Sequence, residues 1–243
     1  MEFAKIICVF YIDTRRLRRI YNKKGDKKIM NQEKTTLLFT GDSITAWDTD
    51  PAKGENERFV CIVKTLLLCA DSTRDIKVIN TGVSGDTTRL LSARWQKDVL
   101  DHSPDYLSIM IGVNDVWRKF DTYGHPEEAV PIEEYTEIYD RLLKKTVSKV
   151  KKIFLITPFL LEKDKNEQMC AILQGYIDAV KALALKYGTE LIDMQAVFDK
   201  FMFEYGIAPE YISGDRVHPG TMGCVLLAKE FLNAFGFDFG LLN

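Results

Sequence analysis

A serine, an aspartate and a histidine in this sequence have the surroundings that nucleophilic catalysis requires. Ser43 follows an apolar, β-prone run, residues 36–40, across a two-residue Gly-Asp break. Much later in the chain, Asp215 precedes His218 by three positions. A carboxylate at that spacing can accept the imidazole Nδ1–H and leave Nε2 free to take a proton from a serine hydroxyl. Together the three residues predict acyl transfer through an activated serine.

Each of these residues also has an ordinary structural explanation. A serine after a strand often caps the next helix, and on its own segment that is the better explanation for Ser43. Asp215 can equally cap the final helix and leave His218 exposed, and the segment alone does not separate the two. The remaining histidines are weaker candidates, because His102 precedes a predicted strand and His125 lies in a long polar loop.

Alternating strand-like and helix-like segments are expected to position these residues. Strands are predicted at five short apolar runs, at residues 36–40, 76–80, 106–111, 153–157 and 189–193. Helices are predicted at about 55–70, 87–100, 132–150, 166–187, 195–204 and 219–235. Short apolar runs are typical of parallel strands buried on both faces, and strict alternation favours helices on both faces of the sheet. The predicted fold class is α/β, a single-domain doubly wound, flavodoxin-like, five-stranded parallel sheet.

The polar, glycine-containing stretches fall where such a fold binds its ligands, at the carboxyl ends of the strands. They are GDSIT at 41–45, NTGVSGDTT at 80–88, GVNDVW at 112–117, and SGDRVHPG at 213–220 before the last helix. The first three each follow a predicted strand. We therefore expect them at one edge of the sheet, although they are far apart in sequence.

Three groups in these stretches could stabilise the oxyanion of an acyl-transfer reaction. Ser43 is expected to open a helix and to present its backbone amide. Gly85 has no side chain to keep a substrate away from its amide, and Asn114 offers a side-chain amide. A positive-φ turn at Gly85 and a loop cap at Asn114 are the structural alternatives.

In order and spacing, the four stretches resemble the signature blocks of the SGNH hydrolase family, also called GDSL esterases or lipases. The serine, glycine, asparagine and histidine that name the family correspond to Ser43, Gly85, Asn114 and His218. The resemblance implies Ser43 as nucleophile, His218 as general base and Asp215 as orienting acid. It also implies an oxyanion hole formed by Ser43, Gly85 and Asn114, and no metal or organic cofactor. It covers residues from about 36 to 235, and the first block reads GDSI where the name-giving sequence has GDSL.

A narrower resemblance concerns the substrate. ARWQKDVL, SIMIGVNDVWRKFD, ITPFLLE, DMQAVFD and DRVHPGTMG look like the bacterial acetylxylan-esterase branch of the family, which removes acetyl groups from xylo-oligosaccharides. This resemblance implies a cytoplasmic homo-oligomer acting on an acetylated oligosaccharide. AWDTDPAKGENERF, after the serine block, is more acidic and less glycine-rich than that branch leads one to expect. A lysophospholipid or another short-chain acyl ester is therefore the alternative substrate. The alternative function is that of a carbohydrate-binding protein without catalysis.

Two tryptophans are candidate substrate contacts. Trp47 lies four residues after Ser43 and Trp117 three after Asn114, and aromatic faces suit sugar rings. Packing in the core or at the rim is the alternative for both. A nucleotide-binding protein of the same fold class is disfavoured, because neither G-x-G-x-x-G nor a P-loop motif follows a strand. G-x-S-x-G is absent as well, which argues against an α/β-hydrolase elbow.

Composition limits the remaining possibilities. A chain of 243 residues, 46% apolar and with a net charge of -2, suits one soluble domain. The near-neutral balance gives no electrostatic reason to expect nucleic acid or an anionic membrane as partner. The five cysteines lack any C-x-x-C and are expected to be buried free thiols in a reducing compartment.

The start of the chain is expected to be an appendage, residues 1–30, that precedes a domain of residues 31–243. Its apolar run, residues 6–12, is far shorter than the roughly 20 residues that span a bilayer. The basic cluster follows that run, whereas a signal peptide carries its charge before it. A short membrane-surface anchor is the alternative.

Overall fold

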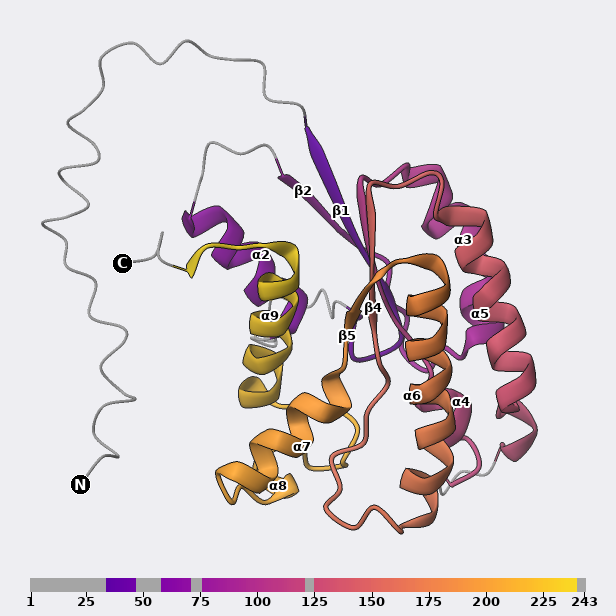
Figure 1. Cartoon of the computed structure of the whole chain (residues 1–243), viewed down its shortest axis with the longest axis vertical. Coiled ribbons are helices and arrows are strands. Elements are labelled where there is room, and N and C mark those ends of the chain that lie inside the picture. Colours follow the sequence, from indigo (N-terminus) through magenta and orange to yellow (C-terminus); the bar gives the residue numbers. More distant parts are fainter. Residues whose placement is uncertain (1–33, 47–57, 71–75, 121–124, 240–243) are drawn as a thin grey trace, which may run out of the picture.

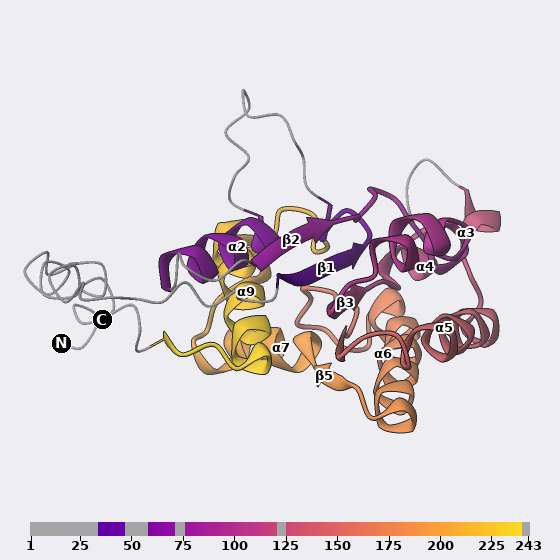
Figure 2. The ribbon, with the colours of Figure 1, turned by 90° about the horizontal axis from the view of Figure 1, so that it is seen from above.

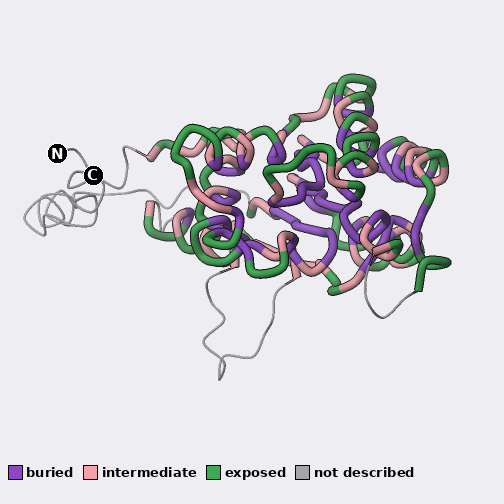
Figure 3. The backbone as a smooth tube through the Cα atoms, turned by 90° about the horizontal axis from the view of Figure 1, so that it is seen from below, coloured by how far each residue is buried: buried purple, intermediate pink, exposed green. Residues whose placement is uncertain are grey.

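A parallel five-stranded sheet in the order β2-β1-β3-β4-β5 forms the centre of the protein. The computed structural model describes residues 34–46, 58–70, 76–120 and 125–239. The strands are β1 (Thr35–Gly41), β2 (Ile76–Asn80), β3 (Tyr106–Met110), β4 (Lys152–Ile156) and β5 (Glu190–Ile192). Each strand boundary lies within one residue of the predicted one. Figure 3 shows a buried centre and exposed outer sides of the helices. The central strands β1, β3 and β4 are mostly buried, as parallel strands covered on both faces require, whereas the edge strands β2 and β5 are only partly buried.

Helices cover both faces of this sheet, which confirms the predicted doubly wound α/β fold (Figures 1 and 2). One face carries α2 (Phe59–Ala70) and α9 (Thr221–Phe235), and the other carries α3 (Thr88–Asp98), α5 (Ile132–Thr146) and α6 (Gln168–Tyr187). α7 (Met194–Glu204) follows β5. Short elements that the sequence analysis did not predict are η3 (Leu100–His102), α4 (Val113–Trp117), η4 (Pro126–Glu128) and α8 (Pro209–Ile212).

The strand order places a crevice at the end of β1. Because β2 and β3 flank β1 on opposite sides, the crossover that leaves β1 for β2 and the crossover that leaves β3 for β4 pass in opposite directions from this point. In the register, Gly41 pairs with Met110, and Phe39 pairs with Asn80. The three segments that follow β1, β2 and β3 therefore emerge next to one another.

Aromatic packing fixes the helices to the sheet. On one face, the ring of Phe231 in α9 lies 4.7 Å from that of Phe39 and 5.1 Å from that of Phe154. On the other face, α5 buries an apolar stripe that includes Tyr135, whose ring packs against Tyr176 of α6. Acidic residues occupy the first turn of α5 and lysines its last turn, so its charges complement the helix dipole.

Some sequence-based expectations fail or fall outside the described residues. Among the four described cysteines, Cys224 is buried, but Cys69 is exposed and Cys61 and Cys170 are half-buried, so the prediction of uniformly buried thiols is wrong. The expected appendage, residues 1–30, lies outside the described part of the chain. No helix in the described part is long and apolar enough to cross a membrane.

Candidate active site

Ser43 lies in a tight turn directly after β1. The amides of Thr45 and Ala46 donate to the carbonyl oxygen of Asp42 at 3.2 and 2.9 Å. The carboxylate of Asp42 turns inward and accepts the amide of Ile44 at 2.9 Å. These bonds satisfy the groups around the turn without using the hydroxyl of Ser43. That hydroxyl is therefore available for another partner.

Gly41 is the residue that lets the chain enter this turn. Its φ is 155°, and a Cβ there would lie 2.0 Å from the carbonyl oxygen of Met110 in the neighbouring strand, so a larger residue does not fit. The prediction that Ser43 opens a helix is wrong for the described residues. The turn is a single one, residues 47–57 lie outside the described part, and α2 begins at Phe59.

The hydroxyl of Ser43 meets the imidazole of His218, which the chain supplies from the segment before α9. Ser43 Oγ lies 2.7 Å from His218 Nε2, and His218 Nδ1 lies 2.6 Å from Asp215 Oδ2. The aspartate thus faces one ring nitrogen and the serine the other. This is the geometry in which the carboxylate selects the tautomer that leaves Nε2 able to accept the serine proton.

Asp215 is held by several donors at once. Its Oδ1 accepts the amides of Val217 at 3.0 Å and His218 at 2.8 Å, and the hydroxyl of Ser213 at 2.9 Å. Burial is the largest single influence and raises the pKa of this carboxyl. Together, the hydrogen bonds from His218, Val217 and Ser213 outweigh the effect of burial and lower the pKa of Asp215 to about 2. The group is therefore ionised throughout the neutral range.

A strained residue shapes the loop between this aspartate and histidine. Arg216 has φ 69°, in the left-handed region that side chains other than glycine rarely adopt. Its carbonyl oxygen accepts the amide of Leu161 at 2.8 Å, and its Nη1 lies 3.0 Å from Glu162 Oε2. These contacts to the segment after β4 hold a backbone conformation that would otherwise be unfavourable.

Gly85 and Asn114, two of the predicted oxyanion donors, line the same cavity as His218. Gly85 has φ 83°, and its carbonyl oxygen accepts Arg118 Nη2 at 3.0 Å, which fixes the peptide that follows Gly85. Asn114 is buried and donates from Nδ2 to the carbonyl oxygen of Asp86 at 3.0 Å, which fixes its amide group. Both the predicted positive-φ turn and the side-chain amide are present in the structure.

The described residues enclose a cavity of about 440 Å³ at this edge of the sheet, and its walls include Ser43, Gly85, Asn114 and His218. Trp117 is a further wall residue, with its ring centroid 5.8 Å from that of His218 in an edge-on arrangement. Trp47, the other predicted substrate contact, lies outside the described residues. The structure thus brings four segments of distant sequence into one cavity.

The other two histidines lie elsewhere. His102 is exposed in η3, ahead of β3 at the amino edge of the sheet. His125 is exposed and pairs with Glu127, with His125 Nδ1 3.2 Å from Glu127 Oε1. Within the described ranges, no three His, Cys, Asp or Glu side chains lie close enough together to hold a metal ion.

Comparison with known proteins places this geometry in a family. A family model described as "GDSL-like Lipase/Acylhydrolase family" matches residues 39–224, which include all four segments around the cavity. The chain belongs to the GDSL-like lipase/acylhydrolase family. The predicted family resemblance is therefore confirmed.

Relatives within this family include a named esterase. The chain is 38% identical over 220 residues to an acetylxylan esterase of Geobacillus stearothermophilus, covering 87% of this chain and 98% of that enzyme. A crystal structure of Axe2, an acetylxylan esterase from the same organism, has a TM-score of 0.77 at 36% identity, covering 85% of this chain and 96% of Axe2. LAE5, described as an alpha/beta hydrolase from the metagenome of Lake Arreo, Spain, has a TM-score of 0.76 at 35% identity, covering 86% and 96%.

Variants of Axe2 bear on the site. Three of its structures are described as catalytic mutants, in which a serine, an aspartate or a histidine is replaced by alanine. The replaced aspartate precedes the replaced histidine by three positions. Asp215 and His218 have the same spacing in this GDSL-family chain.

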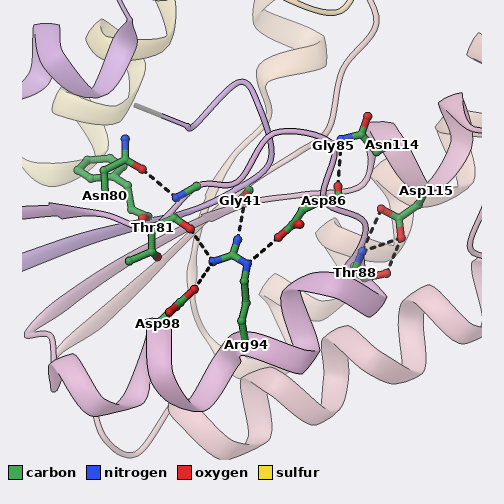
Figure 4. Close-up of polar contacts among 12 residues, drawn as sticks. Gly41, Asn80, Thr81, Gly85, Asp86, Thr88, Arg94, Asp98, Asn114 and Asp115 are labelled. Atoms are coloured by element: carbon green, nitrogen blue, oxygen red, sulfur yellow. Dashed lines mark hydrogen bonds and ion pairs between the residues drawn. The ribbon is translucent and has the colours of Figure 1, made fainter. Parts of the chain in front are cut away.

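Arg94, which the sequence analysis did not single out, connects the segments that carry the expected oxyanion donors (Figure 4). We call these segments the donor side of the site. Arg94 of α3 donates to the carbonyl oxygens of Thr81 at 2.5 Å and Gly41 at 3.0 Å. Its Nε lies 2.6 Å from Asp86 Oδ2, and its Nη1 lies 3.0 Å from Asp98 Oδ2. One guanidinium thus joins the end of β1, the loop after β2 and the residue that follows Gly85.

Two further carboxylates near the site, those of Asp115 and Asp42, are buried. Asp115, next to Asn114, is fully buried and accepts both the amide and the hydroxyl of Thr88 at the start of α3 (Figure 4). Burial raises the pKa of Asp115 to about 6, against the hydrogen bonds from Thr88. Burial also raises the pKa of Asp42 to about 7, with smaller contributions in the same direction from the charges of Asp115 and Asp86.

Proposed function

We propose that this protein is a serine esterase that removes short acyl groups, in particular acetyl groups, from carbohydrate hydroxyls through an acyl-enzyme intermediate. One observation carries the proposal. Ser43 Oγ lies 2.7 Å from His218 Nε2, and both residues line a cavity together with Gly85 and Asn114. The acetylxylan esterase that is 38% identical to this chain supports the acetyl group and the carbohydrate.

The first half of the reaction acylates the serine. His218 Nε2 takes the proton as Ser43 Oγ attacks the ester carbonyl, and the imidazolium that forms faces the ionised Asp215. The negative charge that develops on the carbonyl oxygen is stabilised by the amides of Ser43 and Gly85 and by the side-chain amide of Asn114. The leaving alcohol then takes its proton from His218 Nε2.

The second half releases the acid. Water replaces the alcohol, His218 Nε2 accepts a proton from it, and the resulting hydroxide attacks the acyl group on Ser43. The same donors stabilise the second tetrahedral intermediate. Collapse of that intermediate returns the proton to Ser43 Oγ and frees the carboxylic acid.

The lining of the cavity favours a short acyl group on a hydroxyl-rich alcohol. Among the described residues of its wall, Trp117 is the one large apolar side chain, and Arg58, Arg118 and Asn114 are polar. A long fatty chain needs an extended apolar groove, whereas a sugar ring is bound by an aromatic face together with polar groups. This is why a carbohydrate acetyl ester is preferred here over a lysophospholipid.

The proposal also covers the cellular location, the oligomeric state and the domain boundaries of the enzyme. The resemblance to the acetylxylan-esterase branch supports a cytoplasmic location and a homo-oligomeric assembly. Residues 1–30 are proposed to be an appendage to a catalytic domain of residues 31–243, since the family match begins at residue 39.

Replacing the nucleophile tests the reaction. Ser43→Ala should lower kcat for acetate release from an acetylated xylo-oligosaccharide by about 10⁴-fold or more, because the covalent route is lost. Ser148→Ala, which changes an exposed serine ahead of β4, is the matched control and should leave kcat unchanged. Equal rates for Ser43→Ala and the unmodified protein would refute the proposed nucleophile. Release of fatty acid from lysophospholipid, with none of acetate from carbohydrate, would refute the substrate class.

A further inference from the structure

A second cavity shares part of its wall with the first. The described residues enclose about 490 Å³ there, and two of its wall residues, Arg58 and His218, also belong to the wall of the first cavity. The rest of the wall comes from α8, from the loop that carries Asp215, and from the start of α9. It includes Glu210 and Tyr211. His218 therefore contributes to the walls of both cavities.

The chemistry of the proposed reaction gives the two spaces different occupants. The ester carbonyl oxygen must face Gly85 and Asn114, so the acyl group belongs to the first cavity. The leaving oxygen must receive its proton from His218 Nε2, so the alcohol extends from that nitrogen away from the oxyanion donors. The second cavity, which His218 also lines, can receive it.

We propose that the second cavity binds the sugar that leaves the acyl-enzyme, with the ring of Tyr211 as its stacking surface and Arg58 and Glu210 as partners for its hydroxyls. The inference rests on the proposed esterase function and adds to it a specificity-determining residue, Tyr211. No group in this cavity takes part in proton transfer apart from the shared His218.

Tyr211 stands out by its position. It is 79% exposed on the four-residue helix α8, whose neighbouring Ile212 is buried and holds the helix in place. An exposed aromatic residue is common at protein surfaces and alone indicates nothing. Tyr205, which is 65% exposed, is an example, because it lines neither cavity. Tyr211 differs from it because its ring borders a space that reaches the proposed base, where an aromatic face can cover one side of a sugar ring.

Gly214 leaves the floor of this cavity open. A Cβ at Gly214 would have no atom within 4 Å, whereas at Gly223 it would lie 2.5 Å from Pro219. The backbone of Gly214 is not in the positive-φ region, so a larger residue can be introduced there without that strain. A leucine at this position would occupy space that the sugar is proposed to fill.

The test compares two acetyl esters with leaving groups of different size. Acetylated xylo-oligosaccharide can reach Tyr211, whereas ethyl acetate loses only ethanol and cannot. Tyr211→Ala should lower kcat/KM for the oligosaccharide about tenfold, mainly through KM, because the surface on which the sugar ring is proposed to stack is lost. Its kcat/KM for ethyl acetate should stay within about twofold of the unmodified enzyme. Tyr211→Phe, which keeps the ring, should restore most of the oligosaccharide activity.

A second variant and a matched control complete the experiment. Gly214→Leu should reproduce the selective loss of oligosaccharide hydrolysis by filling the cavity. Tyr205→Ala should leave kcat/KM unchanged for both substrates. Oligosaccharide hydrolysis that is unaffected by Tyr211→Ala and Gly214→Leu would overturn this inference and leave the esterase proposal standing. Equal losses on both substrates would overturn it too, because they indicate a purely structural role. An unmodified enzyme that hydrolyses ethyl acetate but no acetylated carbohydrate would overturn the proposed substrate together with this inference.

Discussion

The candidate active site has a donor side, with Gly85 and Asn114, and a base side, with Asp215 and His218, and the two sides differ in burial. On the donor side, Asn114 and Asp86 are buried, and Arg94 with its four acceptors joins the loops beneath them. On the base side, the side chains of His218 and Asp215 are 31% and 44% exposed. Their loop is held by hydrogen bonds to Asp215 and by contacts of Arg216 with the segment after β4. Oxyanion donors must keep their positions while charge develops, whereas a base that exchanges protons with incoming water must remain accessible.

The aspartates of the two sides differ in the same way. Hydrogen bonds, opposed by burial, lower the pKa of Asp215 to about 2, whereas burial raises the pKa of Asp42 to about 7 and of Asp115 to about 6. A lowered pKa adds stability above about pH 4 that is lost as the pH falls towards 2. A raised pKa has the opposite sign, since the stability that it gives is present below about pH 4 and is lost as the pH rises towards 6 or 7. Aspartate is thus the charged partner of the histidine on the base side, whereas on the donor side it is a buried hydrogen-bond acceptor.

The largest expected effect is on the base side. Asp215→Asn should lower kcat by about 10⁴-fold, because an amide facing His218 Nδ1 favours the tautomer that leaves Nε2 unable to accept a proton. The asparagine oxygen can still accept the amides of Val217 and His218, so the variant should fold. Its melting temperature at neutral pH should fall modestly, because the stability that the ionised carboxylate adds is lost. Asp101→Asn, at an exposed aspartate in η3, is the control and should change neither quantity. A kcat within tenfold of the unmodified enzyme would show that the aspartate does not orient the base.

The next effect concerns the donor side and should appear mainly in stability. Arg94→Met would leave the carboxylate of Asp86 buried without its cation and remove the donor to the carbonyl oxygens of Gly41 and Thr81. Removing one partner of a buried ion pair costs about 3–5 kcal/mol, so the free energy of unfolding should fall by that amount in urea denaturation. Arg141→Met, at an exposed arginine of α5, should cost no more than about 0.5 kcal/mol.

A double variant distinguishes a buried charge from simple loss of packing. Asp86→Asn in the Arg94→Met background should recover part of the lost stability, because it removes the uncompensated charge. No recovery, or equal costs for Arg94→Met and Arg141→Met, would contradict the account of the donor side as a network of buried charge.

The sequence predicted the functional residues of both sides but not the contacts that hold the donor side in place. Short motifs that end strands indicated Ser43, Gly85, Asn114 and the Asp-x-x-His pair, because the parallel fold brings strand ends together and few histidines compete. Arg94 was not predicted, since two of its acceptors are backbone carbonyls from other segments and no local pattern marks such a contact. The single turn at Ser43 was also missed, because a capped helix and an isolated turn begin with the same residues.

An effect on the pH dependence of stability, which tests the difference in pKa directly, is expected at Asp42. Asp42→Asn keeps an oxygen that can accept the amide of Ile44 but removes the titrating group. In the unmodified protein the free energy of unfolding should fall as the pH rises from about 4 to 7, because a proton binds more tightly in the folded state than in the unfolded state. Each pKa unit contributed by burial corresponds to about 1.4 kcal/mol over that window, and Asp42→Asn should remove this part of the slope.

Urea denaturation at pH 4, 5, 6 and 7 measures that slope. Some of it should persist in Asp42→Asn, since the pKa of Asp115 is raised in the same direction and that group still titrates. Asp215→Asn should leave the slope above pH 4 intact, because the pKa of Asp215 lies below the whole window. Identical slopes in Asp42→Asn and the unmodified protein would mean that Asp42 carries its charge without cost. The donor side would then share the electrostatic character of the base side, and the contrast between them would be one of exposure alone.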